Sequence, residues 1–264
     1  MNKNKKIPFV GLHAHSVAGS IFDAIGYPDE HMDFCYENGG EALALTDHGN
    51  MNGFSHQFLH WQKMKAEGKE FKPIFGVEAY FLPSIDEWRE DYNRIKEDAK
   101  LAKTLAKEGD TSGATVEDEE ASKKAVKNIL NRRRHLVLLA QNQTGLNNLF
   151  KLISESYKEE NFYRYPRVDY KMLAKYGEGI IAASACLGGP YAGNFWANRE
   201  EGPEAVREAM RETTRQFVKI FGDRWHGELQ WNQIPEQHEL NQYIIEMHHE
   251  FGIPLISTAD SHYP

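Results

Sequence analysis

Six apolar stretches of this chain carry, at or near one end, side chains of the types that bind metal ions. Each stretch is typical of a buried strand: FVGLHAHS, EALALTDHG, IFGVEAYF, RRRHLVLLA, IIAASACLGG and PLISTADSHYP. Amphipathic segments with a helical period, such as PEAVREAMRETTRQFVKIFG, lie between them. This alternation predicts an α/β fold with a parallel sheet covered by helices. Seven strand candidates favour a closed, barrel-like sheet over an open one: residues 8–13, 41–46, 73–81, 135–140, 179–184, 225–231 and 253–258.

A barrel of this kind gathers the ends of its strands on one face, where sites form. The candidate ligands at these ends are His13, His15, His48, Glu78, His135, Cys186, Asp260 and His262. His13 and His15 are two residues apart on an extended segment, so their imidazoles point to the same side and can chelate one ion. Asp260 and His262 have the same spacing. The first and last strands of a closed barrel are neighbours, so we expect the two pairs to face each other.

Glu78 interrupts an otherwise apolar strand, where a buried carboxylate is costly unless a cation or hydrogen-bond donors accompany it. Asp47 precedes His48, and we expect it to support catalysis by orienting a ligand or the turn. A hydrogen-bonded turn without a metal is the alternative for this Asp-His pair. Asp23, taken by itself, is typical of a carboxylate in a loop.

Two of the candidates have ordinary structural alternatives. His135 follows three arginines and opens LVLLA, so it is equally typical of a histidine at the start of a strand. Cys186 is a thiolate ligand in our interpretation because it lies at a strand end beside Gly188 and Gly189. A small buried core residue is its alternative, since free cysteines are usually buried.

A charged insert at about residues 84–134 interrupts the alternation of strands and helices. Its Glu/Asp–Lys spacing predicts exposed helices. A solvated helical hairpin is the simpler interpretation, and an arm that guides a partner or substrate, with NRRRH as its basic end, is the other.

Composition limits the classes of function. Lys and Arg number 31 against 39 Asp and Glu, a net charge of −8, which argues against a protein that grips nucleic acid with its whole surface. Contact with phosphate through bound metal remains compatible with this charge. The two cysteines have no paired spacing, as expected for a reducing cytoplasm. No apolar run approaches the roughly 20 residues needed to span a membrane.

The motifs HAHS, TDHG, GVEAYF, HLVLLAQN, SACLGG and TADSHY, in this order, resemble the PHP (polymerase and histidinol phosphatase) family. The closest likeness is to the N-terminal PHP domains of bacterial C-family DNA polymerase III alpha subunits. It extends from about Phe9 to Pro264 and is weakest in the insert. The resemblance implies one domain over residues 1–264, with a distorted (β/α)7 barrel and a trinuclear metal site at the C-terminal ends of the strands. The chain stops soon after the last motif and lacks polymerase palm carboxylates, so we expect either a domain cut from a longer polymerase or a free-standing PHP protein.

The resemblance also implies a ligand set for three divalent ions. The first ion would bind His13, His15, Glu78 and Asp260; Glu78 would bridge to a second ion held by His135 and Cys186; and the third would bind Asp23, His48 and His262. Histidine and cysteine suit Zn²⁺ or Fe²⁺, whereas carboxylates accept Mn²⁺, and we favour Zn²⁺ and/or Mn²⁺. Three ions bring six positive charges and four acidic ligands return four, which leaves about two for a phosphate.

The chemistry implied by the resemblance is phosphoester hydrolysis, most simply a 3′→5′ DNA exonuclease with a metal-bound water as nucleophile. The expected substrate is a single-stranded 3′ end, and the expected partners are replicative polymerase parts in cis or trans, in the cytoplasm of a bacterial or virus-infected bacterial cell. A phosphatase for a small phosphate monoester and a structural PHP module supporting a polymerase are the alternatives. Arg164 and Arg167 are candidates to clamp phosphate, with surface arginines beside packed tyrosines as the equal alternative.

Overall fold

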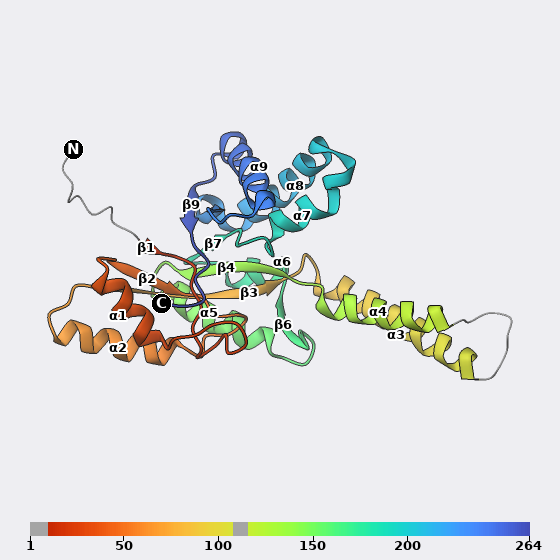
Figure 1. Ribbon diagram of the computed structural model, residues 1–264, viewed down its shortest axis with the longest axis horizontal. Helices are drawn as coiled ribbons and strands as arrows, with labels where there is room; N and C mark the ends of the chain where they lie inside the picture. The colour runs from red at the N-terminus through yellow and green to blue at the C-terminus, as the bar shows by residue number, and fades with distance from the viewer. Residues whose placement is uncertain (1–9, 108–115) are drawn as a thin grey trace.

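The computed structural model describes residues 10–107 and 116–264. Within these residues, seven strands follow one another across the sheet: β1 (Val10–Gly11), β2 (Ala42–Leu45), β3 (Lys72–Phe81), β4 (Arg134–Ala140), β7 (Ile180–Ala183), β8 (Trp225–Gln230) and β9 (Leu255–Thr258). Beyond the first and last strands, Ala14 and Ser261 form a parallel bridge, and His15 N donates to Ser261 O over 2.8 Å. The sheet is therefore a nearly closed barrel, as predicted (Figure 1). The bridge makes the His13/His15 and Asp260/His262 segments neighbours.

One strand runs against the predicted parallel order. β4 pairs antiparallel with both β3 and β7, while β1, β2 and β3 are parallel and so are β7, β8 and β9. The cause is the insert, whose helices α3 (Ile85–Lys107) and α4 (Val116–Asn131) form a hairpin. The hairpin returns the chain to the edge that β3 left, so β4 starts there and His135 pairs with Tyr80. An antiparallel β4 thereby brings the start of a strand to the face where the other strands end.

Helices cover the outside of the barrel (Figure 1). They are α1 (Pro28–Glu37), α2 (Phe54–Ala66), α5 (Gln143–Ser156), α6 (Tyr170–Tyr176), α7 (Pro190–Asn198), α8 (Pro203–Phe221) and α9 (Pro235–Phe251), with short 3₁₀ turns at Arg199–Glu201 and Gly222–Arg224. Four of them begin with proline, whose fixed φ and missing N–H suit the first helical position. Gly252, at φ 68°, ends α9 in the left-handed conformation that glycine favours.

The buried side chains follow the strand period of two and the helical period of 3.6. Small inward-facing side chains fill the barrel, among them Ala44, Val137, Leu139 and Ala183. The larger core lies between the outer face of the sheet and the helices. There α8 contributes one buried stripe with helical spacing: Val206, Met210, Phe217 and Phe221. The ends of the strands that carry the candidate ligands lie above this packed interior.

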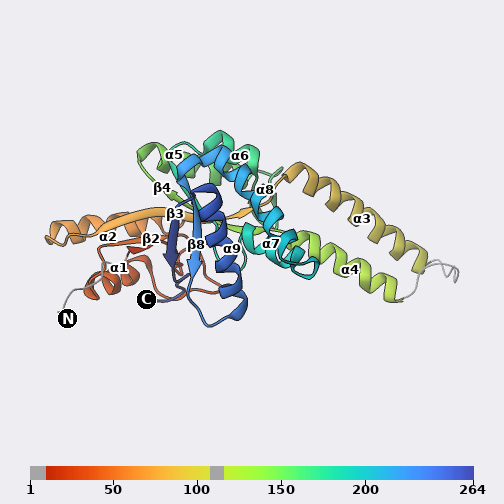
Figure 2. The ribbon, with the colours of Figure 1, turned by 90° about the horizontal axis from the view of Figure 1, so that it is seen from above.

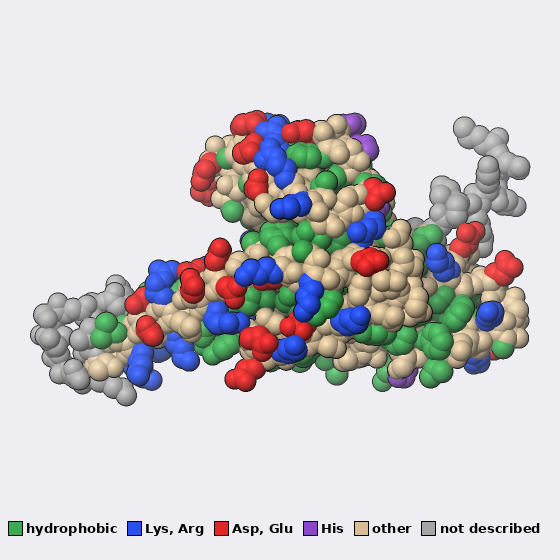
Figure 3. All heavy atoms as spheres, turned by 180° about the vertical axis from the view of Figure 1, so that it is seen from behind, with side chains coloured by type: hydrophobic (Ala, Val, Ile, Leu, Met, Phe, Trp, Pro, Cys, Tyr) green, Lys and Arg blue, Asp and Glu red, His purple; other side chains and the backbone are tan. Residues whose placement is uncertain are grey.

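The helices α3 and α4 project from the body as an arm (Figure 2), with acidic and basic side chains interspersed along it (Figure 3). At the root of the arm, Trp88 Nε1 donates to Ile129 O over 2.9 Å within a small core that includes Leu82 and Tyr92. The hairpin of β5 (Phe162–Tyr163) and β6 (Tyr165–Val168) packs beside this root and pairs with the end of β3. In the described ranges no helix is long and apolar enough to cross a membrane. That the chain is one domain stays a prediction.

Candidate metal centre

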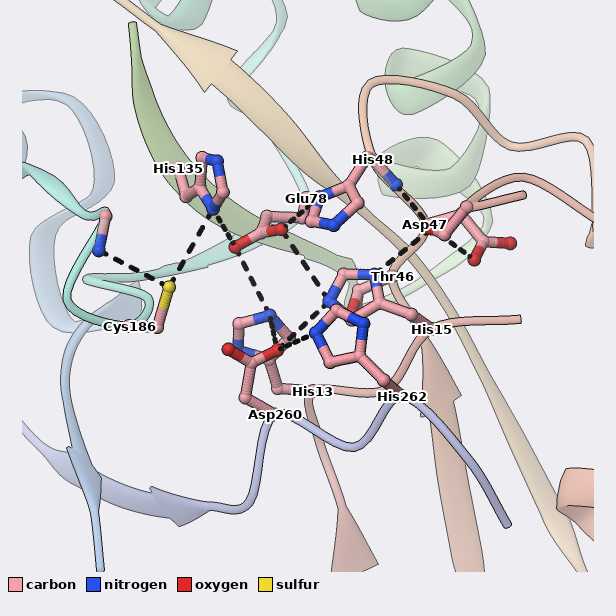
Figure 4. A network of polar contacts seen from close by, with 12 residues as sticks. His13, His15, Thr46, Asp47, His48, Glu78, His135, Cys186, Asp260 and His262 are labelled. Atoms are coloured by element: carbon pink, nitrogen blue, oxygen red, sulfur yellow. Dashed lines mark hydrogen bonds and ion pairs between the residues drawn. The ribbon is translucent and has the colours of Figure 1, made fainter. Parts of the chain in front are cut away.

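Glu78 lies at the centre of a group of imidazoles at the strand-end face (Figure 4). Its side chain is fully buried in β3. One carboxylate oxygen is 3.3 Å from His13 Nε2 and 3.0 Å from His135 Nδ1. The other is 2.6 Å from His48 Nδ1 and 3.6 Å from His15 Nε2. Segments following β1 and β2 and the start of β4 therefore converge on one buried carboxylate.

Asp260 forms the second anionic position of the centre. Its Oδ1 is 3.2 Å from His13 Nε2, 3.1 Å from His15 Nε2 and 3.4 Å from His262 Nε2. Asp260 has φ 51°, a left-handed backbone conformation that is uncommon outside glycine. Closure of the barrel therefore places the terminal segment against the HAH segment, as the sequence predicts.

The remaining predicted ligands complete the rim. Asp23 Oδ2 is 3.0 Å from His48 Nε2, and its Oδ1 is 3.8 Å from His262 Nδ1. Cys186 Sγ, in the turn after β7, is 3.8 Å from His135 Nδ1. All nine predicted ligands thus belong to one connected group, including the loop carboxylate that has no strand-end signal of its own.

The buried polar atoms of this group fit divalent cations. In the described part of the chain, His13 Nε2, His48 Nδ1 and both carboxylate oxygens of Glu78 are buried without a hydrogen-bond partner. The carboxylate oxygens of Glu78 lie at ion-pair distance from these imidazole nitrogens, 3.3 Å for His13 Nε2 and 2.6 Å for His48 Nδ1. Unpartnered buried polar atoms are costly, and a cation between them would satisfy them together. Ligand atoms come within 4.8 Å of one another in three sets: His13/His15/Glu78, His48/Glu78/His135 and His15/His48/His262.

The pKa shifts of Glu78 and Cys186 also fit a bound cation. Burial alone would raise the pKa of Glu78, but the nearby charges of His13 and His135 hold it well below its usual range. Glu78 is therefore an anion at neutral pH. Burial, reinforced by the charges of Glu78 and Asp260, raises the pKa of the Cys186 thiol well above its usual value. A cation is needed to convert this thiol into a thiolate ligand.

Asp47 supports the centre without facing it. Its carboxylate accepts hydrogen bonds from Ser16 N at 2.6 Å, Ser16 Oγ at 2.8 Å and Ser20 Oγ at 2.9 Å. Ser20 Oγ is in turn 3.3 Å from His15 Nδ1. Asp47 thus holds the loop after β1 and reaches His15 through Ser20, in keeping with the orienting role expected of it.

Glu228, in β8, is a residue that the sequence analysis missed. Its Oε1 is 2.7 Å from His13 Nδ1 and also accepts from Thr258 Oγ1 at 2.5 Å and Gln230 Nε2 at 3.1 Å. Engaging Nδ1 leaves Nε2 of His13 directed at Glu78 and Asp260, as in carboxylate–histidine–metal triads. Glu228 could have been found in WHGELQ by the argument used for Glu78, because it is a carboxylate within a strand. The structure shows that it is fully buried there.

Arg167 is not available to clamp phosphate, contrary to the prediction. Its side chain is completely buried. The guanidinium donates to the backbone carbonyls of Tyr163 at 2.5 Å and Leu130 at 2.7 Å, and lies 4.1 Å from the ring centre of Trp88. Because its donors are used by the protein's own backbone, Arg167 ties the end of α4 and the arm root to the β5–β6 hairpin.

Comparison with known proteins identifies the family of this chain. A profile of the PHP domain matches residues 11–231. The chain belongs to the PHP domain family. It is 37% identical over 255 residues to the DNA polymerase III subunit alpha of Aquifex aeolicus, covering 97% of this chain and 18% of that protein. It is 33% identical over 255 residues to the same subunit of Borreliella burgdorferi, covering 97% of this chain and 18% of that protein. It is 33% identical over 260 residues to that of Treponema pallidum, covering 98% of this chain and 18% of that protein. The chain therefore spans less than a fifth of the length of these relatives.

Proposed function

We propose that this PHP domain is a metal-dependent phosphoesterase that removes nucleotides from the 3′ end of single-stranded DNA. The observation that carries the proposal is Glu78, a buried anion whose two oxygens lie unpartnered among four imidazoles. Hydrolysis of phosphoesters is a reaction for which such clusters are suited. The replicative polymerase relatives favour a nucleic acid substrate and a polymerase as partner.

The proposed metal content is three divalent ions, held by the nine ligands in the three sets that the family resemblance implies. Imidazole and thiol ligands favour Zn²⁺, with Fe²⁺ as an alternative, and the carboxylates also accept Mn²⁺. When bound, such ions polarise a phosphoryl oxygen and activate water at neutral pH.

The protein's own groups fix this geometry and balance its charge. Glu228 holds the ring of His13, and the pair of Asp47 and Ser20 holds the ring of His15. Glu78 and Asp260 supply negative charge between the imidazoles. Ligands that are positioned before substrate arrives need no reorganisation during the reaction.

The centre is more exposed on one side than on the other. The side chains of His13 and Glu78 are fully buried, whereas that of Asp23 is 49% exposed and that of His262 is 29% exposed. Water and substrate therefore reach the centre from the side of Asp23 and His262. An open rim of this kind accepts the end of a polymer as well as a small ester.

Single-stranded DNA labelled at its 5′ end, incubated with the protein and Mn²⁺ or Zn²⁺, tests the proposal. We expect a ladder of products shortened from the 3′ end, which Asp260→Asn abolishes. His56→Gln, at an exposed position of α2, is the matched control and keeps the activity.

Two other outcomes would contradict the exonuclease. Intact DNA with turnover of p-nitrophenyl phosphate would identify a monoester phosphatase. No turnover of either compound by the metal-loaded protein would identify a structural module of a polymerase.

A further inference from the structure

Three arginines lie around the ring of Tyr165. The guanidinium of Arg133 is 3.9 Å from the centre of this ring, that of Arg164 is 5.7 Å away and that of Arg167 is 5.9 Å away. No carboxylate of the described residues forms an ion pair with any of these three arginines. Three guanidinium groups at one ring create a strong local positive potential in a chain whose net charge is −8.

Arg133 forms no ion pair with any carboxylate in the described part of the chain. Its Nη1 donates to the carbonyl of Asn131 over 3.1 Å, but its Nε is buried and has no partner in the described ranges. The preceding Arg132 is instead paired with Asp91 at 2.9 Å, and the donors of Arg167 are taken by carbonyls. The Arg133 side chain is partly exposed, and no carboxylate of the described residues neutralises its charge, so an external anion can pair with it.

Tyr80 connects this cluster to the metal centre. It lies two residues after Glu78 on β3, so the two side chains point to the same face of the strand. The Tyr80 ring is stacked on that of His48, with ring centres 6.2 Å apart. The guanidinium of Arg133 is 4.9 Å from the centre of the Tyr80 ring. Arg133 is thus held one aromatic ring away from the ligands of the centre.

The neighbouring hairpin supplies surfaces on which bases can stack. Phe162 is 40% exposed and Tyr163 is 38% exposed, in the strand that precedes Arg164. Arg164 is itself exposed and occupies the turn with φ 66°. Aromatic rings beside arginines bind single-stranded nucleic acids, because rings stack on bases and guanidinium groups fork onto phosphate oxygens.

We propose that Arg133, Arg164 and the ring of Tyr165 form a subsite for single-stranded nucleic acid, which binds a phosphodiester upstream of the one at the metal centre. The subsite deepens the proposed function and rests on it, because the strand would run from the β5–β6 hairpin to its 3′ end at the open rim of the metal centre. The chemistry recognised is the phosphate backbone with an unpaired base, which DNA and RNA share.

Binding of a fluorescent phosphorothioate dT₁₂ to the metal-loaded protein, followed by anisotropy, tests the subsite. Loss of one charged phosphate contact weakens binding about tenfold and reduces the slope of log K against log salt by about 0.7 for a single strand. We expect this for Arg133→Gln, and also for Arg164→Gly, since glycine accepts the positive φ without strain. Arg215→Gln removes the same charge from an exposed position of α8 and serves as the control.

The affinities and salt slopes of the three variants decide whether the arginines form a subsite. Equal affinity and salt slope for Arg133→Gln, Arg164→Gly and Arg215→Gln, or no binding by the wild type, would overturn it. Thermal melting checks that each variant is folded, and the Arg164→Gly result stands if Arg133→Gln is not. A phosphorothioate U₁₂ strand shows whether the subsite serves DNA, RNA or both. If DNA is bound through the arginines but never cut, the exonuclease proposal alone is contradicted. If DNA is cut but the arginine substitutions leave binding unchanged, the subsite alone is contradicted.

Discussion

Replacing Arg167 by methionine separates a structural role from a phosphate-binding one. The guanidinium donates to the carbonyls of Tyr163, Leu130 and Tyr165, and methionine leaves these acceptors buried without donors. Each bond from a charged donor contributes about 1.5–3 kcal/mol. Burial, with the charge of Arg133, lowers the pKa of Arg167 to about 10, so the cost of burying the charge offsets part of this sum. The expected net loss in free energy of unfolding is about 3–5 kcal/mol, typical of breaking a buried charged interaction.

Urea unfolding in the presence of EDTA measures this loss without a contribution from bound metal. Arg215→Met, at an exposed position of α8, is the control, and we expect a change within about 0.5 kcal/mol there. An equally small change for Arg167→Met, together with a large loss of oligonucleotide binding, would refute the structural role and restore the phosphate clamp.

Three further predictions concern the metal centre. Glu228→Gln removes the anion behind His13 and should weaken metal binding about 10- to 100-fold in competition with a chromophoric chelator; unchanged affinity would contradict the orienting role. Cys186→Ser should reduce affinity for Zn²⁺ more than for Mn²⁺ in calorimetry, because a thiolate is the softer ligand, and an equal loss would argue against sulfur ligation. EDTA should lower the melting temperature of the wild type, since ions at 100 times their Kd stabilise by about 2.7 kcal/mol, but leave that of Asp260→Ala nearly unchanged.

The barrel and the convergence of the candidate ligands on one face were predictable from the sequence because both depend on local patterns. Apolar strands of two to ten residues alternate with helices, and the expected positions agree with the strands of the described ranges to within a few residues. His13 and His15 share a side because a strand has period two. The pairing of Ala14 with Ser261 then follows from closure of the barrel.

The errors concern features that depend on tertiary context. The direction of β4 is set by the return path of the helical arm, which apolar periodicity does not report. The sequence shows only that Arg167 lies near tyrosines. Its burial depends on contacts with Leu130 and Trp88, which are distant in the chain. Glu228 was predictable in principle, since it is a carboxylate in a buried strand like Glu78, but only its contact with His13 reveals what it does.

Anomalous diffraction from crystals grown with Mn²⁺ or Zn²⁺ tests the central claim most directly. We predict metal peaks, three when the centre is full, with one or more at about 2.0–2.3 Å from the carboxylate of Glu78. The neighbouring ligands of these peaks would include His13, His15, His48 and His135. A map without a peak at bonding distance from Glu78, at metal concentrations that saturate the protein in solution, would contradict the account.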